Sequence, residues 1–112
     1  MSESRGRIYL LHFDSPFSHA RHYLGYAGIG LHKRLAAHAG GRGARLTQVV
    51  LAAGIGWTVS RVWKGTRKDE RRLKQWNGLD EVCPLCRPAP RPVRWLVASR
   101  LPWKRFRKVD PS

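Results

Sequence analysis

Two short apolar runs near the start of the chain constrain its fold more than any other feature. Residues 7–13 (RIYLLHF) and 22–27 (HYLGYA) are rich in β-forming side chains, and each run is too short for an ordinary helix. The turn signal DSP follows the first run directly. The sequence therefore predicts an antiparallel hairpin with residues 14–21 as its loop and a tyrosine near the start of each strand.

The hydrophobic period changes after the hairpin. Helical spacing predicts a first helix, which is marked by Leu31, Arg34, Leu35 and His38 and ends at AGGRG, residues 39–43. A second helix is predicted after it and is marked by Leu46, Val49, Val50 and Ala53. Residues 54–65 (GIGWTVSRVWKG) return to alternation. That alternation predicts a strand with Trp57, Val59, Arg61 and Trp63 on one face.

A capping box predicts the last helix. Thr66 is the N-cap and Asp69 the acidic residue three positions on, so a helix is expected over residues 67–76. The element order β-β-α-α-β-α describes a small α/β domain over residues 1–78. Residues 79–112 form a separate, Pro-rich, basic C-terminal extension, because CPLCRPAPRP holds four prolines in ten residues.

The charge indicates a polyanionic partner. The chain has 22 Lys and Arg against 7 Asp and Glu, a formal net charge of +15. Self-repulsion of that size favours nucleic acid as the partner, DNA or RNA, and an anionic membrane surface as the alternative. The C-terminal extension mixes Trp95, Trp103 and Phe106 with many cations, which suits an arm on the DNA backbone or a segment on a membrane. No apolar run is long enough for a transmembrane helix, and we expect a cytoplasmic protein.

Cys83 and Cys86 form a CxxC pair, which is half of a structural Zn²⁺ site. No second CxxC exists, and no histidine pair with ligand spacing follows it. His19 and His22 are three positions apart but belong to the hairpin. The sequence favours a packed pair of cysteines over a zinc site.

Few acidic residues are available for catalysis. Glu70 lies on the predicted last helix, where an i,i+4 ion pair with Lys74 is the ordinary explanation. One carboxylate with waters and a substrate phosphate would also suit Mg²⁺. Arg34 and His38 are four positions apart and share a helix face.

Taken together, these elements resemble the GIY-YIG nuclease superfamily over residues 6–77. The triplets read Arg7-Ile8-Tyr9 and Tyr23-Leu24-Gly25, and they are followed in order by Arg34, His38 and Glu70. Arg7 replaces the first glycine of the family pattern, and Leu24 replaces an isoleucine. The stretches HAGGRGARL and WKGTRKDERRLK are similar to small stand-alone bacterial members.

The resemblance implies a three-stranded antiparallel sheet flanked by helices and a DNA endonuclease that uses one divalent cation, Mg²⁺ or Mn²⁺, and no small-molecule cofactor. By position, Glu70 would hold the metal and Arg34 would clamp the scissile phosphate. Tyr9 would be the general base or would orient the attacking water, with His38 as the rival base, and Tyr23 would support the water or phosphate. The implied substrate-contacting residues are Gly25, Lys74 and Asn77.

Two alternatives remain open at this point. One is a catalytically silent nucleic-acid-binding module on the same fold. The other is a basic structural component of a ribonucleoprotein in which the tyrosine spacing arises by chance.

Overall fold

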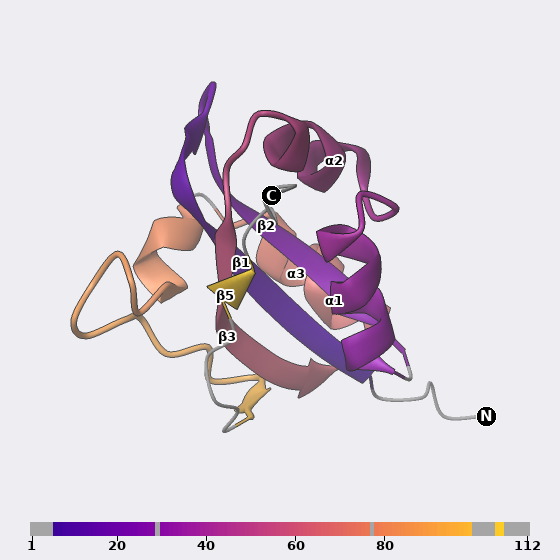
Figure 1. Cartoon of the computed structure of the whole chain (residues 1–112). Coiled ribbons are helices and arrows are strands. Elements are labelled where there is room, and N and C mark those ends of the chain that lie inside the picture. The colour runs from indigo at the N-terminus through magenta and orange to yellow at the C-terminus, as the bar shows by residue number, and fades with distance from the viewer. Residues whose placement is uncertain (1–5, 29, 77, 100–104, 107–112) are drawn as a thin grey trace.

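An antiparallel sheet forms the middle layer of the molecule (Figure 1). The computed structural model describes residues 6–28, 30–76, 78–99, 105 and 106. The strands are β1 (Gly6–Phe17), β2 (Ala20–Ala27), β3 (Trp57–Gly65), β4 (Val97–Ala98) and β5 (Arg105–Phe106). Their order is β2-β1-β3-β4, and β5 also pairs with β3. The predicted fold class, a small α/β (α+β) domain with an antiparallel sheet flanked by helices, is confirmed; the two short strands beyond β3 were not predicted.

The hairpin is longer than predicted. Pairing continues to Phe17 and Ala20, so the turn is confined to Ser18 and His19 and the predicted loop over residues 14–21 is wrong. Ser18 has φ 55°, a left-handed conformation that a two-residue turn requires. The register shifts between His12 and Phe17, which lets the polar DSP segment stay within an extended ribbon.

Three helices cover the sheet, as predicted. They are α1 (Leu31–Ala39), α2 (Arg45–Ala52) and α3 (Arg67–Lys74), followed by the short 3₁₀ helix η1 (Leu79–Val82). The capping box is confirmed at α3: the Asp69 backbone N–H donates to Thr66 Oγ1 at 3.2 Å, and the Thr66 N–H donates to Asp69 Oδ2 at 3.0 Å. None of the helices in the described part of the chain is long and apolar enough to cross a bilayer.

Alternate residues of β1 enter two different cores. Tyr9, Leu11 and Phe13 pack in the cluster that includes Leu35 of α1 and Val50 of α2. The intervening residues pack in a second cluster with α3 and the C-terminal extension, which contains Ile8, Leu10, Leu24, Trp63, Leu73, Val82, Cys83 and Val93. Because β1 is central and covered on both faces, its sequence is a continuous apolar run and does not alternate between apolar and polar residues.

A β-bulge in β3 changes which of its residues share a face, compared with the prediction. Leu10 pairs with Arg61 while the next residue, Leu11, pairs with Val59, so Ser60 is an extra residue in β3. Trp57 and Val59 therefore belong to the α1–α2 core and Trp63 belongs to the opposite one. The predicted single face is wrong because strict alternation cannot pass through an inserted residue.

The first part of the C-terminal extension packs on the domain. Val82, Cys83 and Val93 are buried in the α3-side core. Trp95, which was predicted to belong to an arm on the DNA backbone or a segment on a membrane, lies edge-on to Trp76 with ring centroids 6.0 Å apart, and Arg72 Cζ lies 4.3 Å from the centroid of the Trp95 ring. Trp103 lies outside the described residues.

Candidate active site

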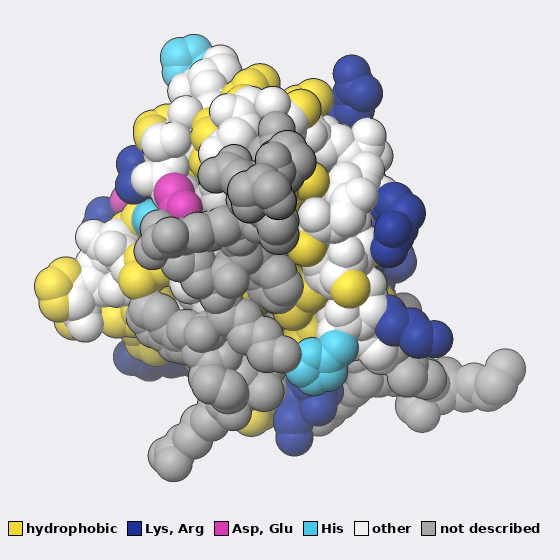
Figure 2. Space-filling view, in the orientation of Figure 1, with side chains coloured by type: hydrophobic (Ala, Val, Ile, Leu, Met, Phe, Trp, Pro, Cys, Tyr) yellow, Lys and Arg dark blue, Asp and Glu magenta, His cyan; other side chains and the backbone are white. Residues whose placement is uncertain are grey.

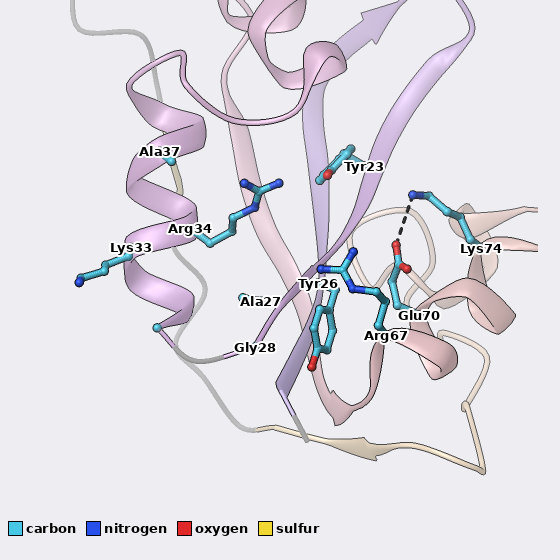
Figure 3. A pocket seen from close by; sticks show the side chains of 11 residues that line it. Tyr23, Tyr26, Ala27, Gly28, Lys33, Arg34, Ala37, Arg67, Glu70 and Lys74 are labelled. Carbon is cyan, nitrogen blue, oxygen red and sulfur yellow. Dashed lines mark hydrogen bonds and ion pairs between the residues drawn. The ribbon is translucent and has the colours of Figure 1, made fainter. Parts of the chain in front are cut away.

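A cleft of about 550 Å³ opens along β2, between α1 and α3 (Figure 3). Within the described residues, β2 pairs with β1 alone, so its other edge faces this cleft. The lining residues are Tyr23, Tyr26, Ala27, Gly28, Gly30, Lys33, Arg34, Ala37, Arg67, Glu70 and Lys74. Four of these side chains are cations and one is a carboxylate, so the cleft is suited to bind an anionic ligand.

Three of the predicted catalytic residues and the predicted substrate-contacting residue Lys74 converge here from three different elements. Arg34 reaches in from α1 and Glu70 from α3, with Tyr23 of β2 between them (Figure 3). Glu70 is 7% exposed although it is charged. Lys74 Nζ lies 3.2 Å from Glu70 Oε1, which confirms the i,i+4 pair predicted from the spacing. Lys74 also lies 6.0 Å from the centroid of the Tyr23 ring.

Tyr9 and His38 lie behind the cleft wall and do not line it. Both side chains are fully buried, and the Tyr9 hydroxyl is 2.6 Å from His38 Nε2. On the other side of the ring, His38 Nδ1 is 2.8 Å from Thr47 Oγ1. The Thr47 hydroxyl donates to the Ala44 carbonyl at 2.7 Å.

This chain of hydrogen bonds assigns the histidine tautomer. A hydroxyl has one hydrogen, and Thr47 gives it to Ala44, so Thr47 Oγ1 accepts from His38 Nδ1–H. Nε2 is then unprotonated and accepts the Tyr9 O–H. The network orients His38 as a proton acceptor toward Tyr9.

Burial is the main factor that keeps both Tyr9 and His38 neutral. Burial, with a further contribution from the neighbouring Tyr23, raises the pKa of Tyr9 above its ordinary value. Burial and then Arg34 lower the pKa of His38 to about 4. Interaction with the Tyr9 hydroxyl is the largest cause that raises the pKa of Arg34, so the guanidinium is fixed as a cation beside the two tyrosines.

Gly25 is required by the packing of the two tyrosines. It pairs with Tyr9 across the hairpin, and a Cβ at this position would overlap the Tyr9 phenol and press on the Tyr23 ring. The Tyr9 and Tyr23 rings can therefore approach to a centroid distance of 6.2 Å. Gly25 therefore does not line the cleft; it allows the Tyr9 and Tyr23 side chains to pack closely.

The structure also brings in residues that the sequence analysis did not select. Lys33 neighbours Arg34, and Arg67 lies three positions before Glu70 on α3, so helical spacing alone could have placed Arg67 on the cleft face. Thr47 had no comparable signal, because the loop between α1 and α2 brings it to His38. Asn77, which the resemblance assigned to substrate contact, lies outside the described residues.

A second cluster of polar side chains lies on the opposite face of the hairpin. The ligand atoms of His12, His22, Cys83 and Cys86 all lie within 4.8 Å of one another, and such a group could hold a metal ion. The two donors besides the cysteines lie upstream in the sequence, where His12 and His22 pair directly across β1 and β2. The observed register of the hairpin, which differs from the predicted one, sets the two histidines opposite each other, and cross-strand neighbours point to the same face.

Among the charged side chains that Figure 2 shows, Lys and Arg are more prominent than Asp and Glu. On the face shown in Figure 2, Lys and Arg side chains line the side of the molecule where α1 and α2 lie, and little Asp or Glu surface is seen. This distribution agrees with the formal net charge of +15. No family model, no curated protein and no solved structure matches the chain.

Proposed function

We propose that the protein is a metal-dependent endonuclease that hydrolyses DNA phosphodiester bonds in the cleft between α1 and α3. The observation that carries the proposal is the convergence of Arg34, Tyr23 and Glu70 on one cleft from three separate elements. The hydrogen-bonded pair Tyr9–His38 directly behind this wall adds a proton acceptor to the same place. The resemblance to GIY-YIG nucleases named the same residues, and the geometry supports their acting together.

In this proposal the cleft binds one backbone phosphate. Lys33, Arg34, Arg67 and Lys74 provide the positive field that draws in the DNA backbone. Arg34 contacts the scissile phosphate, where a planar guanidinium can bind two oxygens and offset the charge that grows in the transition state.

Glu70 would hold the cation. The Glu70 carboxylate lines the cleft although it is nearly buried, and its oxygens are the ligand type that Mg²⁺ and Mn²⁺ prefer. One carboxylate and a substrate phosphate are enough, because Mg²⁺ keeps most of its waters when bound. Lys74 forms an ion pair with one oxygen of this carboxylate, and this ion pair would have to break for that oxygen to bind a cation. When bound, the cation supplies Lewis-acid stabilisation of the phosphate and the leaving oxygen.

Tyr9 and His38 would share the role of general base. The Tyr9 oxygen takes a proton from the attacking water as its own proton passes to His38 Nε2, which is 2.6 Å away and unprotonated. Tyr9 has no exposed surface in the free protein. Arg34 therefore has to shift from the tyrosine hydroxyls onto the phosphate before this transfer takes place.

A nicking assay tests the proposal. Supercoiled plasmid and a panel of branched and linear DNAs are incubated with the protein and Mg²⁺, Mn²⁺ or EDTA. We expect cleavage with either metal, none with EDTA, and loss of more than about 100-fold in rate for Glu70→Gln. Glu81→Gln, whose carboxylate pairs with Arg91 outside the cleft, is the matched control and should cut like the wild type.

A non-enzymatic DNA-binding module is the second candidate, favoured by the four cations of the cleft. The same experiment separates the two functions. Folded wild-type protein that binds every DNA in the panel and cuts none with either metal would establish the binding module and refute the nuclease.

A further inference from the structure

We propose that His12, His22, Cys83 and Cys86 form a tetrahedral structural Zn²⁺ site that joins the β1–β2 hairpin to the C-terminal extension. The proposal is independent of the nuclease function, because none of the four residues lines the α1–α3 cleft.

The spacing of the donor atoms matches tetrahedral zinc coordination. His12 Nδ1 lies 3.3 Å from His22 Nε2, 3.5 Å from Cys83 Sγ and 3.6 Å from Cys86 Sγ. Cys86 Sγ lies 3.3 Å from His22 Nε2. For Zn–N bonds of about 2.05 Å and Zn–S bonds of about 2.3 Å, tetrahedral geometry places two nitrogens about 3.3 Å apart and a nitrogen and a sulfur about 3.6 Å apart.

The chemistry of the ligands selects the metal. Two sulfurs and two imidazole nitrogens in tetrahedral arrangement are typical of Zn²⁺, whereas Mg²⁺ and Ca²⁺ require oxygen ligands. Two thiolates and two neutral imidazoles balance the charge of one Zn²⁺, so the complex can lie against the core that contains Cys83 at little electrostatic cost. Four protein ligands leave no position for a substrate, which is the pattern of a structural site.

The fold presents all four ligands from two hydrogen-bonded segments. His12 and His22 are directly paired across the hairpin, and their rings meet edge to face with centroids 5.2 Å apart. Cys83 and Cys86 flank a tight turn in which the Cys86 N–H donates to the Cys83 carbonyl at 3.1 Å and the Arg87 N–H donates to it at 3.0 Å. This turn directs both sulfurs to the hairpin.

A zinc ion at this place would hold the extension on the domain. The extension between Cys86 and β4 has no regular secondary structure, since its prolines cannot donate backbone hydrogen bonds. Zinc would link it to a strand pair 71 positions earlier in the sequence, counted from Cys83 to His12. The cross-link would supply stability that a short irregular segment cannot obtain from backbone pairing.

Metal analysis of the full chain tests the proposal. Protein purified from zinc-supplemented cells should contain one zinc per chain, measured by elemental mass spectrometry of the digested protein. After exchange, Co²⁺ should give the intense visible bands of tetrahedral coordination together with thiolate-to-metal charge transfer. Cys86→Ser and His22→Gln should each lower zinc affinity by at least about 10-fold, whereas His19→Gln, an exposed histidine at the hairpin turn, should bind as the wild type does.

A wild-type measurement keeps the test decisive if a variant fails to fold. Cys86 is exposed, so a thiol reagent should modify it slowly in the zinc-loaded protein and at least about 10-fold faster after chelation. Folded wild-type protein that takes up less than a tenth of an equivalent of zinc, an octahedral Co²⁺ spectrum without charge transfer, or unchanged zinc affinity in both ligand variants would overturn the proposal.

Discussion

The two faces of one hairpin present two chemically different sets of side chains. On one face, Tyr9 and Tyr23 pack against His38 of α1, beside the cation-lined cleft. On the other face, His12 and His22 meet the two cysteines of the extension. Successive residues of a strand point to opposite faces, so a single strand pair can take part in both sites. The hairpin separates them by the thickness of a sheet.

The difference between the two sites is one of ligand chemistry and access. The cleft offers one carboxylate among cations in an open space of about 550 Å³, which suits a hard cation brought in with a phosphate. The cluster offers only nitrogen and sulfur at closed tetrahedral spacing. We therefore expect perturbations of the cluster to act on stability and perturbations of the cleft to act on cleavage.

Removal of zinc should give the largest effect on stability. With free zinc at about 1,000 times its dissociation constant, binding stabilises the folded state by about 4 kcal/mol, so chelation should lower the unfolding midpoint by more than about 10 °C. Thermal unfolding followed by circular dichroism, with and without a chelator, measures it. The Cys86→Ser variant should show little response to the chelator, and an equally large response in that variant would place the metal elsewhere.

Arg34→Ala should give the largest effect on cleavage after loss of the Glu70 carboxylate. Removal of a charged group that stabilises the transition state costs about 10²–10³-fold in rate. Single-turnover nicking measures it, with DNA affinity determined on the same preparation. Arg45→Ala removes an exposed arginine of α2 outside the cleft and serves as the control. Equal losses in the two variants would show that only overall charge matters.

The pH dependence of stability should report on the Tyr9–His38–Thr47 network. The pKa of His38 is lowered to about 4 in the folded protein, against about 6.5 when unfolded. The unfolded chain therefore binds the extra proton first, and stability is lost as the pH falls from about 6.5 toward 4. The titratable and charged groups that face the ring are Tyr9 of β1, Tyr23 of β2 and Arg34 of α1, and Thr47 of α2 is its neutral hydrogen-bond partner.

Denaturant unfolding of wild type and His38→Gln between pH 7 and pH 4 isolates this contribution. The difference in stability between the two proteins should shrink by about 1–3 kcal/mol over this range, since one pKa unit corresponds to about 1.4 kcal/mol. Comparison with the variant cancels the titration of His12 and His22, which both proteins share. A difference that stays constant with pH would contradict a buried neutral His38.

The smallest expected effect is at the cap of α3. Thr66→Ala removes the side chain that accepts from the Asp69 N–H and should lower the free energy of unfolding by about 1 kcal/mol. Because α3 carries Glu70, fraying of its first turn should also slow cleavage several-fold while leaving the zinc content unchanged. Equilibrium unfolding and metal analysis measure the two quantities, and a loss of zinc would show that the sites are coupled.

The sequence predicts the elements of this fold better than their junctions. Short runs of β-forming residues identify β1 and β2, alternation identifies β3, and the Thr66–Asp69 box identifies α3, because these signals are local. The bulge at Ser60 was missed because an extra residue leaves the composition of β3 unchanged while reversing which face each side chain occupies.

The candidate sites divide in the same way. Arg34, Glu70 and the tyrosines were found because they follow a linear order along the chain. The role of Thr47 depends on a loop conformation, and the metal cluster depends on contact between His12 and Cys83, 71 positions apart. Only a tertiary arrangement brings those donors together.

The most direct test compares one variant from each site in a single measurement, the single-turnover cleavage rate of DNA already bound, at a temperature where both variants are folded. We predict that Glu70→Gln loses more than about 100-fold in rate and keeps its zinc, while Cys86→Ser loses zinc and stability but cuts within a few-fold of the wild type. Cleavage that follows zinc content and survives Glu70→Gln would contradict the assignment of catalysis to the cleft.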